Sequence, residues 1–311
     1  MLKKEEINQD LVNLVIILQE KKFSPVRIKQ CIMKETGWGK TKAGEVYKAA
    51  IRGKLTKMVE IKNEPAQPPK ILLIDIETAP SLGYVWGKWE QNVIEFKEDW
   101  YMLSFAFKWL GDKKVQARIL PDYPFYKKNP YNDKYLIEEL WRLFDEADII
   151  IAHHGDGFDV KKSNARFITH NLTPPSPYKT IDTLKIARRY FKFDSNKLDD
   201  LAQYLKIGRK AAHEGKNTWL GCMTGDMKSW GIMKKYNAHD VTLLEEVYLR
   251  LRGWASTHPN LDNFTKNGNC PNCQSPQLQR RGWNVAKTGK RSRLHCQKCG
   301  AWSSGSQLIK T

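Results

Sequence analysis

Apolar positions recur at helical spacing in the first part of the chain and predict three short helices. The second helix begins at Ser24-Pro25, because serine is a preferred N-cap and proline suits the first helical position, and it stops near Gly37. The third follows a glycine turn and leaves Lys48 and Arg52 opposite its apolar face. The stripes are Ile7, Leu11, Leu14, Val15 and Leu18 in the first helix, and Ala43, Val46, Tyr47, Ala50 and Ile51 in the third.

Two helices joined by a short glycine turn, with basic residues on the second, resemble a helix-turn-helix that binds DNA. A three-helix bundle with a solvated basic face would show the same pattern. The sequence therefore predicts a helical, helix-turn-helix-like domain, with DNA contact and a solvated face as equal alternatives.

Strand and helix patterns alternate in the middle of the chain. Residues 71–74 and 148–152 predict buried strands, and residues 103–109 and 115–120 predict a hairpin around a Gly-Asp turn. A strand hairpin beside alternating α/β units implies a mixed sheet flanked by helices. The predicted helices cover residues 136–144, 157–168, 198–205 and 227–251.

Two polar segments divide the chain into three predicted domains. The segment 62–70 contains three prolines and predicts a semi-rigid linker, and the segment 253–263 follows the last long helical pattern. The predicted organisation is a helical domain over 1–61, a linker over 62–70, an α/β domain over 71–252, a linker over 253–263 and a small module over 264–311.

Charge is distributed unevenly over these segments. The 311 residues carry 52 Lys and Arg against 34 Asp and Glu, a formal charge of +18. Residues 1–63 hold 14 basic and 7 acidic side chains, residues 64–263 hold 29 and 27, and residues 264–311 hold 9 and none. A nearly neutral middle between basic ends favours a partner that is a polyanion, usually nucleic acid.

A membrane surface would also attract positive charge, but the chain has no run of 18 apolar residues and no secretory signal pattern at its start. We therefore expect no membrane partner and a cytoplasmic protein. The hydrophobic fraction of 41% is sufficient for a core and argues against global disorder.

Acidic residues follow the first predicted strand of the α/β domain. Asp75 and Glu77 are two positions apart, so on a strand their side chains point to the same face and can meet one cation. Two carboxylates at the end of a buried strand repel each other unless a metal neutralises them. An exposed pair of acids in a turn is the alternative.

Two further motifs carry carboxylates at comparable places. The sequence from His153 to Asp159 follows the strand 148–152 and delivers an acid where a helix begins. Tyr236 and Asp240 are four residues apart on the last helix, which places a phenol and a carboxylate on one face.

Asp75, Glu77, Asp159 and Asp240, with Tyr236 before the last, resemble the DEDD exonuclease superfamily in its tyrosine variant. That variant includes the proofreading exonuclease domain of family B DNA polymerases and phage-encoded exonucleases related to it. The resemblance covers residues 71–251, including the stretches 84–89 and 195–202. It implies a ribonuclease H-like fold and hydrolysis with two metal ions. If the gene belongs to a phage, the location would be the host cytoplasm.

The resemblance also implies a role for each motif residue. Asp75 would bridge two Mg²⁺ or Mn²⁺ ions, and Glu77 and Asp240 would complete one of the two sites. Asp159 would support the other site. Tyr236 would orient the attacking water, because a phenol with a pKa near 10 is a poor base at neutral pH.

Several positions depart from the pattern or compete with it. Relatives usually carry asparagine where this chain has His154, and Asp156 is a second acid in the same motif. The histidine variant needs a histidine where this chain has Lys235, so we expect His239 to be structural or solvent-facing. Asp182, Asp199 and Asp200 are expected to be helix-start and surface acids.

Aromatic residues follow the first motif and have two interpretations. They could stack on the bases of a nucleic-acid strand, or they could fill the core beneath a long loop, which is the interpretation we favour. They are Tyr84, Trp86, Trp89, Trp100 and Tyr101.

Four cysteines in two CxxC pairs predict one tetrahedral zinc site near the end of the chain: Cys270, Cys273, Cys296 and Cys299. The module resembles a zinc ribbon of DNA-processing enzymes, and with so few apolar residues it requires structural zinc to fold. Basic residues interleaved with Trp283 and Trp302 favour nucleic acid over protein as its partner.

Together these features predict a metal-dependent 3′–5′ exonuclease that acts on single strands or 3′ ends of DNA, with two Mg²⁺ or Mn²⁺ ions and one structural Zn²⁺. A structure-specific endonuclease with the same fold is the first alternative. A non-catalytic nucleic-acid-binding protein is the second. The sequence identifies no protein partner.

Overall fold

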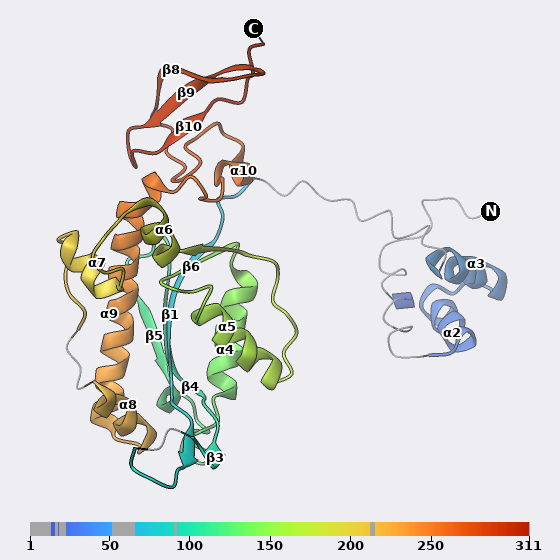
Figure 1. Cartoon of the computed structure of the whole chain (residues 1–311). Helices are drawn as coiled ribbons and strands as arrows, with labels where there is room; N and C mark the ends of the chain where they lie inside the picture. Colours follow the sequence, from blue (N-terminus) through green and yellow to red (C-terminus); the bar gives the residue numbers. More distant parts are fainter. Residues whose placement is uncertain are drawn as a thin grey trace. The chain divides into compact units, whose positions relative to one another are not determined.

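The computed structural model describes residues 14, 15, 18, 23–51, 66–89, 92–211 and 215–310. The chain divides into two compact units, residues 1–65 and 66–311, and each is described by itself (Figure 1). Most of the predicted first helix and Arg52 lie outside the described residues. The finer domain boundaries remain predictions.

The first unit contains α2 (Pro25–Thr36) and α3 (Lys40–Ile51). Ser24 caps α2 by accepting a hydrogen bond from the backbone N–H of Arg27 at 3.4 Å. Gly37 ends the helix with a φ of 70°, a left-handed conformation that suits glycine. Two helices around a glycine turn agree with the predicted order, whereas DNA contact remains a prediction. The buried core of this unit is Val15, Ile28, Ile32, Ala43 and Val46.

The second unit is built on a five-stranded mixed sheet with the order β5-β4-β1-β6-β7. β4 pairs antiparallel with β1 and β5, whereas β1, β6 and β7 are parallel neighbours. The predicted hairpin and both predicted buried strands are therefore confirmed. The strands are β1 (Ile71–Thr78), β4 (Met102–Trp109), β5 (Gln116–Ile119), β6 (Ile149–Ala152) and β7 (Lys179–Asp182).

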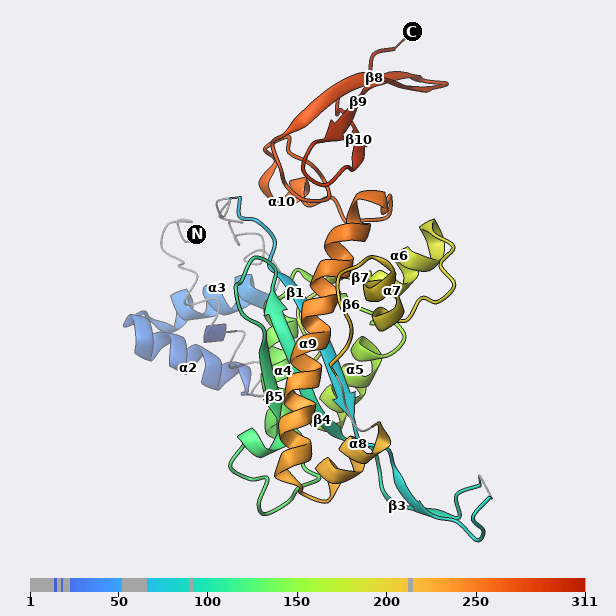
Figure 2. The same cartoon turned by 90° about the vertical axis from the view of Figure 1, so that its left-hand side faces the viewer.

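Helices cover both faces of the sheet (Figures 1 and 2). Alternation along β1 sends Leu72, Ile74 and Ile76 into one apolar cluster with α4 and α5. Ile71 and Leu73 enter a second cluster with α6, α7 and α9. The helices are α4 (Lys134–Glu146), α5 (Asp159–Thr169), α6 (Thr183–Tyr190), α7 (Leu198–Tyr204), α8 (Lys216–Met223) and α9 (Met227–Leu251), with short 3-10 turns η3 (Leu120–Asp122) and η4 (Arg252–Trp254).

A separate hairpin follows β1. Its strands β2 (Leu82–Tyr84) and β3 (Glu95–Glu98) pair only with each other among the described strands. Trp86 and Trp89 are 83% and 84% exposed, and Tyr84 is also exposed. The expectation of core packing is thus wrong for these three residues, because the hairpin does not join the main sheet; it is correct for Tyr101, which is buried.

The chain ends in a small antiparallel sheet, which we call the C-terminal sheet. It consists of β8 (Leu278–Ala286), β9 (Gly289–Cys296) and β10 (Trp302–Ser304), preceded by α10 (Asp262–Thr265). The first cysteine loop contacts the end of α9, since Asn272 Nδ2 donates to the carbonyl oxygen of Arg252 at 2.7 Å. Gly253 packs so closely on Cys299 that a Cβ there would overlap the Cys299 carbonyl.

Candidate active site

The two acids of the first motif lie at the carboxyl end of β1. Asp75 and Glu77 occupy the odd-numbered positions of the strand, which face the α9 side of the sheet. Their neighbours Ile74 and Ile76 point into the core on the other side and are buried. The strand pattern therefore places both carboxylates on one face, as predicted.

Helix α9 brings the third motif to the same place. Asp226 caps this helix by accepting from the backbone N–H groups of Lys228 and Ser229, and the helix continues for 25 residues. Tyr236 and Asp240 lie on its buried face. The carboxylates of Asp75, Glu77 and Asp240 each offer an oxygen within 4.8 Å of the others.

Asp159 approaches from the opposite side of β1, at the first residue of α5. It is only 3% exposed, and its Oδ1 accepts a hydrogen bond from the backbone N–H of Ile76 at 3.2 Å. It is not one of the three carboxylates within 4.8 Å. It is nevertheless close enough for its charge to raise the pKa of Asp75.

Burial raises the pKa of all four acids, and repulsion from the other acids of the cluster adds to this for Asp75 and Glu77. Removal from water, followed by the charges of Glu77, Asp159 and Asp240, raises the pKa of Asp75 well above its usual value. Burial followed by repulsion from Asp240 raises the pKa of Glu77 to about 8, and burial raises that of Asp159 to about 7. Burial also raises the pKa of Asp240. A bound cation would relieve this repulsion, so such a cluster of carboxylates favours cation binding.

Lys210 contacts this cluster with its ammonium group, and sequence reasoning missed it. Its ammonium group pairs with Asp240 and donates to the Tyr236 hydroxyl at 2.9 Å. It comes from the loop after α7, where a lysine among other basic residues gives no sequence signal. One ammonium offsets only part of the charge of four carboxylates.

Two other residues at the site were also missed. Asn237 donates through Nδ2 to the carbonyl oxygen of Asp75 at 3.0 Å and to its carboxylate at 2.5 Å. Its Oδ1 accepts from the hydroxyl of Ser104 at 3.0 Å, so it joins α9 to both β1 and β4. Trp219 of α8 hydrogen-bonds to Glu77, which lowers the pKa of that acid, and packs edge-on against Tyr236. Asn237 could have been found from its position on the helical face shared by Tyr236 and Asp240.

The donor set fits a divalent metal. Oxygen ligands from carboxylates suit Mg²⁺ and Mn²⁺. Oδ1 of Asp240 is buried and has no hydrogen-bond partner among the described residues, so it is available for a cation. The three clustered carboxylates and Asp159 are therefore the residues that could hold catalytic metals.

A cleft with a volume of about 690 Å³ opens beside Asp75. Its charged lining combines three cations with three acids: Arg188, Lys197 and Lys210, and Asp75, Asp194 and Asp199. The three cations offset the repulsion that the three acids of the lining would exert on a phosphate. The cleft therefore gives an anionic substrate access to the carboxylates.

His153 and Asp156, two further polar residues of the second motif, have structural contacts. The ring nitrogens of His153 lie 2.9 Å from the Thr183 hydroxyl and 2.9 Å from the Asn196 carbonyl oxygen, and burial lowers its pKa to about 4. Asp156 forms an ion pair with Lys185 at 2.6 Å and is not among the clustered acids.

The contacts of His239 and Asp182 can also be compared with the roles expected from the sequence. Nε2 of His239 lies 2.6 Å from the Arg209 carbonyl oxygen, which agrees with a structural histidine. Asp182 caps α6, in agreement with its expected place at a helix start, although it is buried rather than on the surface.

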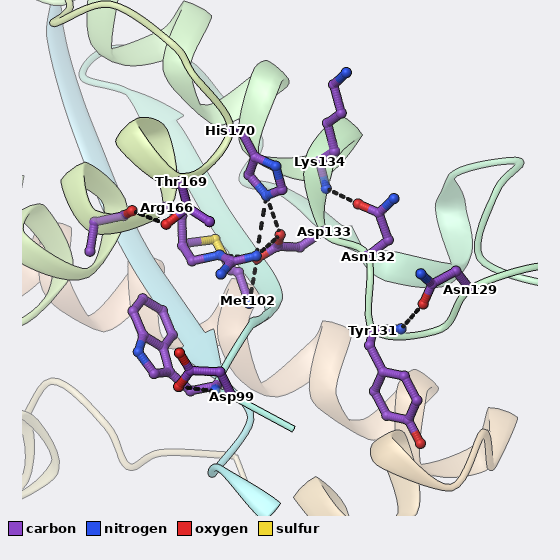
Figure 3. Close-up of polar contacts among 12 residues, drawn as sticks. Asp99, Met102, Asn129, Tyr131, Asn132, Asp133, Lys134, Arg166, Thr169 and His170 are labelled. Carbon is purple, nitrogen blue, oxygen red and sulfur yellow. Dashed lines mark hydrogen bonds and ion pairs between the residues drawn. The ribbon is translucent and has the colours of Figure 1, made fainter. Parts of the chain in front are cut away.

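A buried polar network holds α5 against its neighbours (Figure 3). Asp133 is fully buried, and its carboxylate accepts from the backbone N–H of Met102 at 2.8 Å and from two nitrogens of Arg166 at 2.8 and 2.5 Å. His170 Nε2 lies 2.6 Å from the same carboxylate. Since Arg166 and His170 follow Asp159 along α5, this network fixes the helix that presents Asp159.

Comparison with known families agrees with this geometry. Residues 98–252 match the family RNase_H_2, described as RNase_H superfamily. The match supports the ribonuclease H-like superfamily. The mixed α/β architecture is consistent with the ribonuclease H-like fold, whose members are generally nucleases that use divalent metals. A search of curated proteins finds no match to the chain.

A second candidate metal centre lies in the C-terminal part of the chain, after η4. Cys270, Cys273, Cys296 and Cys299 each offer a sulfur within 4.8 Å of the others, and two of the Sγ–Sγ distances are 3.6 Å. Zinc–sulfur bonds of about 2.3 Å in a tetrahedron require sulfurs at about this separation. The four cysteines therefore fit one zinc ion.

No helix in the described ranges is long and apolar enough to cross a membrane.

Proposed function

We propose that the chain is a metal-dependent 3′–5′ exonuclease that hydrolyses phosphodiester bonds of DNA, in single strands or at 3′ ends. The observation that carries this proposal is the cluster of Asp75, Glu77 and Asp240 in a ribonuclease H-like domain, with Asp159 beside Asp75. Four acids with raised pKa values, of which Asp75 lines a cleft, are the donor set of a metal-assisted phosphodiester hydrolase.

Each acid has a proposed role in holding two Mg²⁺ or Mn²⁺ ions. Asp75 would be shared by both ions, with Glu77 and Asp240 on one and Asp159 on the other. When bound, the ions would lower the pKa of a water molecule and stabilise the leaving 3′ oxygen. The cleft lysines and Arg188 would hold the phosphates of the strand.

Tyr236 would position the attacking water rather than deprotonate it. Burial and the charge of Asp240 raise the pKa of its hydroxyl, so the phenol stays protonated near neutral pH. The hydroxyl accepts from Lys210 and hydrogen-bonds to Asp240, which fixes its direction. A fixed hydroxyl beside the acids can orient a water molecule without exchanging a proton.

Digestion of 3′-labelled and 5′-labelled DNA strands with Mg²⁺ tests the proposal. We expect mononucleotides from linear 3′ ends and no cleavage of closed circles. Asp75→Asn and Asp240→Asn should each lower the rate at least about a hundredfold, because each removes one ligand charge. Asp156→Asn is the matched control, since its carboxylate belongs to the same region but pairs with Lys185.

Retained activity in Asp75→Asn and Asp240→Asn would overturn the assigned site. Cleavage of circles would instead favour an endonuclease. Matched RNA strands in the same assay establish the sugar preference.

We further propose that the four cysteines bind one structural Zn²⁺. All four ligands would be thiolates, so no position would remain open for catalysis. Metal analysis of the purified full chain should find one zinc per molecule, and Cys296→Ser should lose it. A chain that contains no zinc while its C-terminal sheet is folded would contradict this role.

A further inference from the structure

The C-terminal sheet presents a tryptophan beside cations on one of its faces. The register of the sheet places Trp302 opposite His295 and Ser304 opposite Arg293, so these side chains share a face. The rings of Trp302 and His295 are 4.5 Å apart at 31°, and the Arg293 guanidinium lies 5.1 Å from the Trp302 ring. Trp302 is nevertheless 51% exposed.

The other face has a different character. Trp283 lies opposite Ser292 and is contacted by Arg280 at 4.2 Å and by Lys290 at 4.9 Å. Trp283 is half-buried, whereas Trp302 is 51% exposed. Trp302 is therefore the tryptophan of the sheet whose exposed surface is available to a ligand.

Charge around the sheet defines the ligand further. Residues 264–311 contain nine basic residues and no acid. No carboxylate of the described residues forms an ion pair with Arg293, whose Nε donates to the Arg281 carbonyl oxygen at 2.9 Å. The site therefore favours an anion that also has a flat apolar surface.

A single nucleic-acid strand combines these two properties. Each nucleotide has a phosphate for a guanidinium and a base with two flat faces for an aromatic ring. A duplex presents its phosphates, but its base faces are covered by stacking. An acidic protein segment offers charge without a ring for Trp302.

We infer that the face formed by Trp302, His295 and Arg293 is a binding site for single-stranded nucleic acid. An unpaired base stacks on Trp302, and Arg293 contacts the neighbouring phosphate. The site is separate from the carboxylates and performs no chemistry. It goes beyond the proposed exonuclease, because the chain would bind single strands here even if it cleaved none.

Fluorescence anisotropy of a labelled oligothymidine with the full chain, in buffer without Mg²⁺ or Mn²⁺, tests this site apart from cleavage. Trp302→Ala should weaken binding of the single strand by about tenfold, within the range for loss of one stacked base. Trp302→Phe should restore most of the affinity, since it keeps an aromatic ring. Val285→Ala is the matched control, because Val285 is a 75% exposed apolar residue of the same sheet.

A blunt duplex of equal charge and a polyglutamate of equal charge distinguish other ligands. We expect the affinity for duplex to be unchanged by Trp302→Ala and polyglutamate to compete poorly. Equal losses for single strand and duplex, or full competition by polyglutamate, would overturn the stacking site.

A measurement on the unmodified chain covers the case in which Trp302→Ala does not fold. Photocrosslinking of an iodouracil-containing strand should identify Trp302 as a crosslinked residue in the mass spectrum. Crosslinks that avoid residues 293–304 altogether would sink the inference.

Discussion

Glu77 shows how one residue can link the site to the stability of the protein. Burial and repulsion from Asp240 raise its pKa from 4.5 to about 8. Between pH 4.5 and about 8, the folded protein therefore keeps a proton on Glu77 that the unfolded chain has already released. Stability falls as pH rises wherever the folded state binds more protons.

We predict that the full chain, without Mg²⁺ or Mn²⁺, loses thermal stability as pH rises from about 6.5 to about 8. His153 opposes this loss only at the lower end of the window, because its pKa in the folded protein is lowered to about 4 and the unfolded imidazole is mostly neutral about one pH unit above its usual value of 6.5. Glu77→Gln should flatten the dependence, and Mn²⁺ should restore stability at the upper end. Melting curves at several pH values measure this effect; equal slopes for wild type and Glu77→Gln would contradict it.

His154 marks a position where backbone geometry decides which residues are allowed. Its φ is +67°, in the left-handed region, where asparagine and histidine are enriched. The same geometry suits asparagine, the residue that the resemblance in sequence leads one to expect at this position. Histidine in place of asparagine at position 154 is thus compatible with the backbone of the turn that follows β6.

We predict that His154→Asn leaves the free energy of unfolding unchanged, whereas His154→Val lowers it by about 1 kcal/mol or more, because a β-branched residue is strained at positive φ. Denaturant titration of both variants provides the measurement. Equal stability of the two variants would show that backbone strain at this position is negligible.

At the scale of elements, patterns of apolar residues were sufficient to predict the central strands and the long helices. Alternation along β1 placed Asp75 and Glu77 on one face, and helical spacing placed Tyr236 and Asp240 together. Contacts between elements were not predictable in this way. Lys210 reaches Asp240 from a loop, and Asn237 joins three elements, because such contacts depend on tertiary packing rather than on local spacing.

The exposed hairpin after β1 illustrates the same limit. Aromatic composition alone cannot distinguish a filled core from an exposed surface, since aromatic residues are common in both. The interpretation therefore failed for Trp86 and Trp89, which lie in a hairpin that pairs with no other described strand.

We predict that Asn237→Ala disturbs both stability and cleavage, because the substitution leaves the Asp75 carbonyl and the Ser104 hydroxyl without their partner. Loss of such buried hydrogen bonds costs about 1 to 3 kcal/mol. Thr242→Ala is the control on the same helix, since Thr242 is exposed and bonds only within α9. Denaturant titration and initial cleavage rates should separate the two variants; matching values would remove Asn237 from the site.

At the scale of the whole molecule, the excess of positive over negative charge lies mainly outside the residues that carry the acid cluster. Residues 64–263 are nearly neutral, whereas residues 264–311 carry nine basic side chains and no acid. The acids repel phosphate, and the basic C-terminal residues attract it. Substrate binding and the chemical step are thus expected to depend on different parts of the chain.

We predict that deletion of residues 264–311 weakens DNA binding and reduces its salt dependence more than it changes the rate of single-turnover cleavage. Fewer phosphate contacts release fewer counterions, so the slope of log affinity against log salt becomes shallower. Binding titrations at several salt concentrations and rapid-quench cleavage at saturating enzyme measure the two effects. Loss of single-turnover cleavage would assign the C-terminal residues to the active site.

The contact between Gly253 and Cys299 limits how this protein can be rearranged. Because a side chain at position 253 would overlap the Cys299 carbonyl, and because Asn272 bonds to the Arg252 carbonyl, the cysteine loops are fitted to the residues that end α9. The C-terminal residues are therefore not an interchangeable cassette. A chimaera that transferred them to another protein would have to bring residues 252–255 as well.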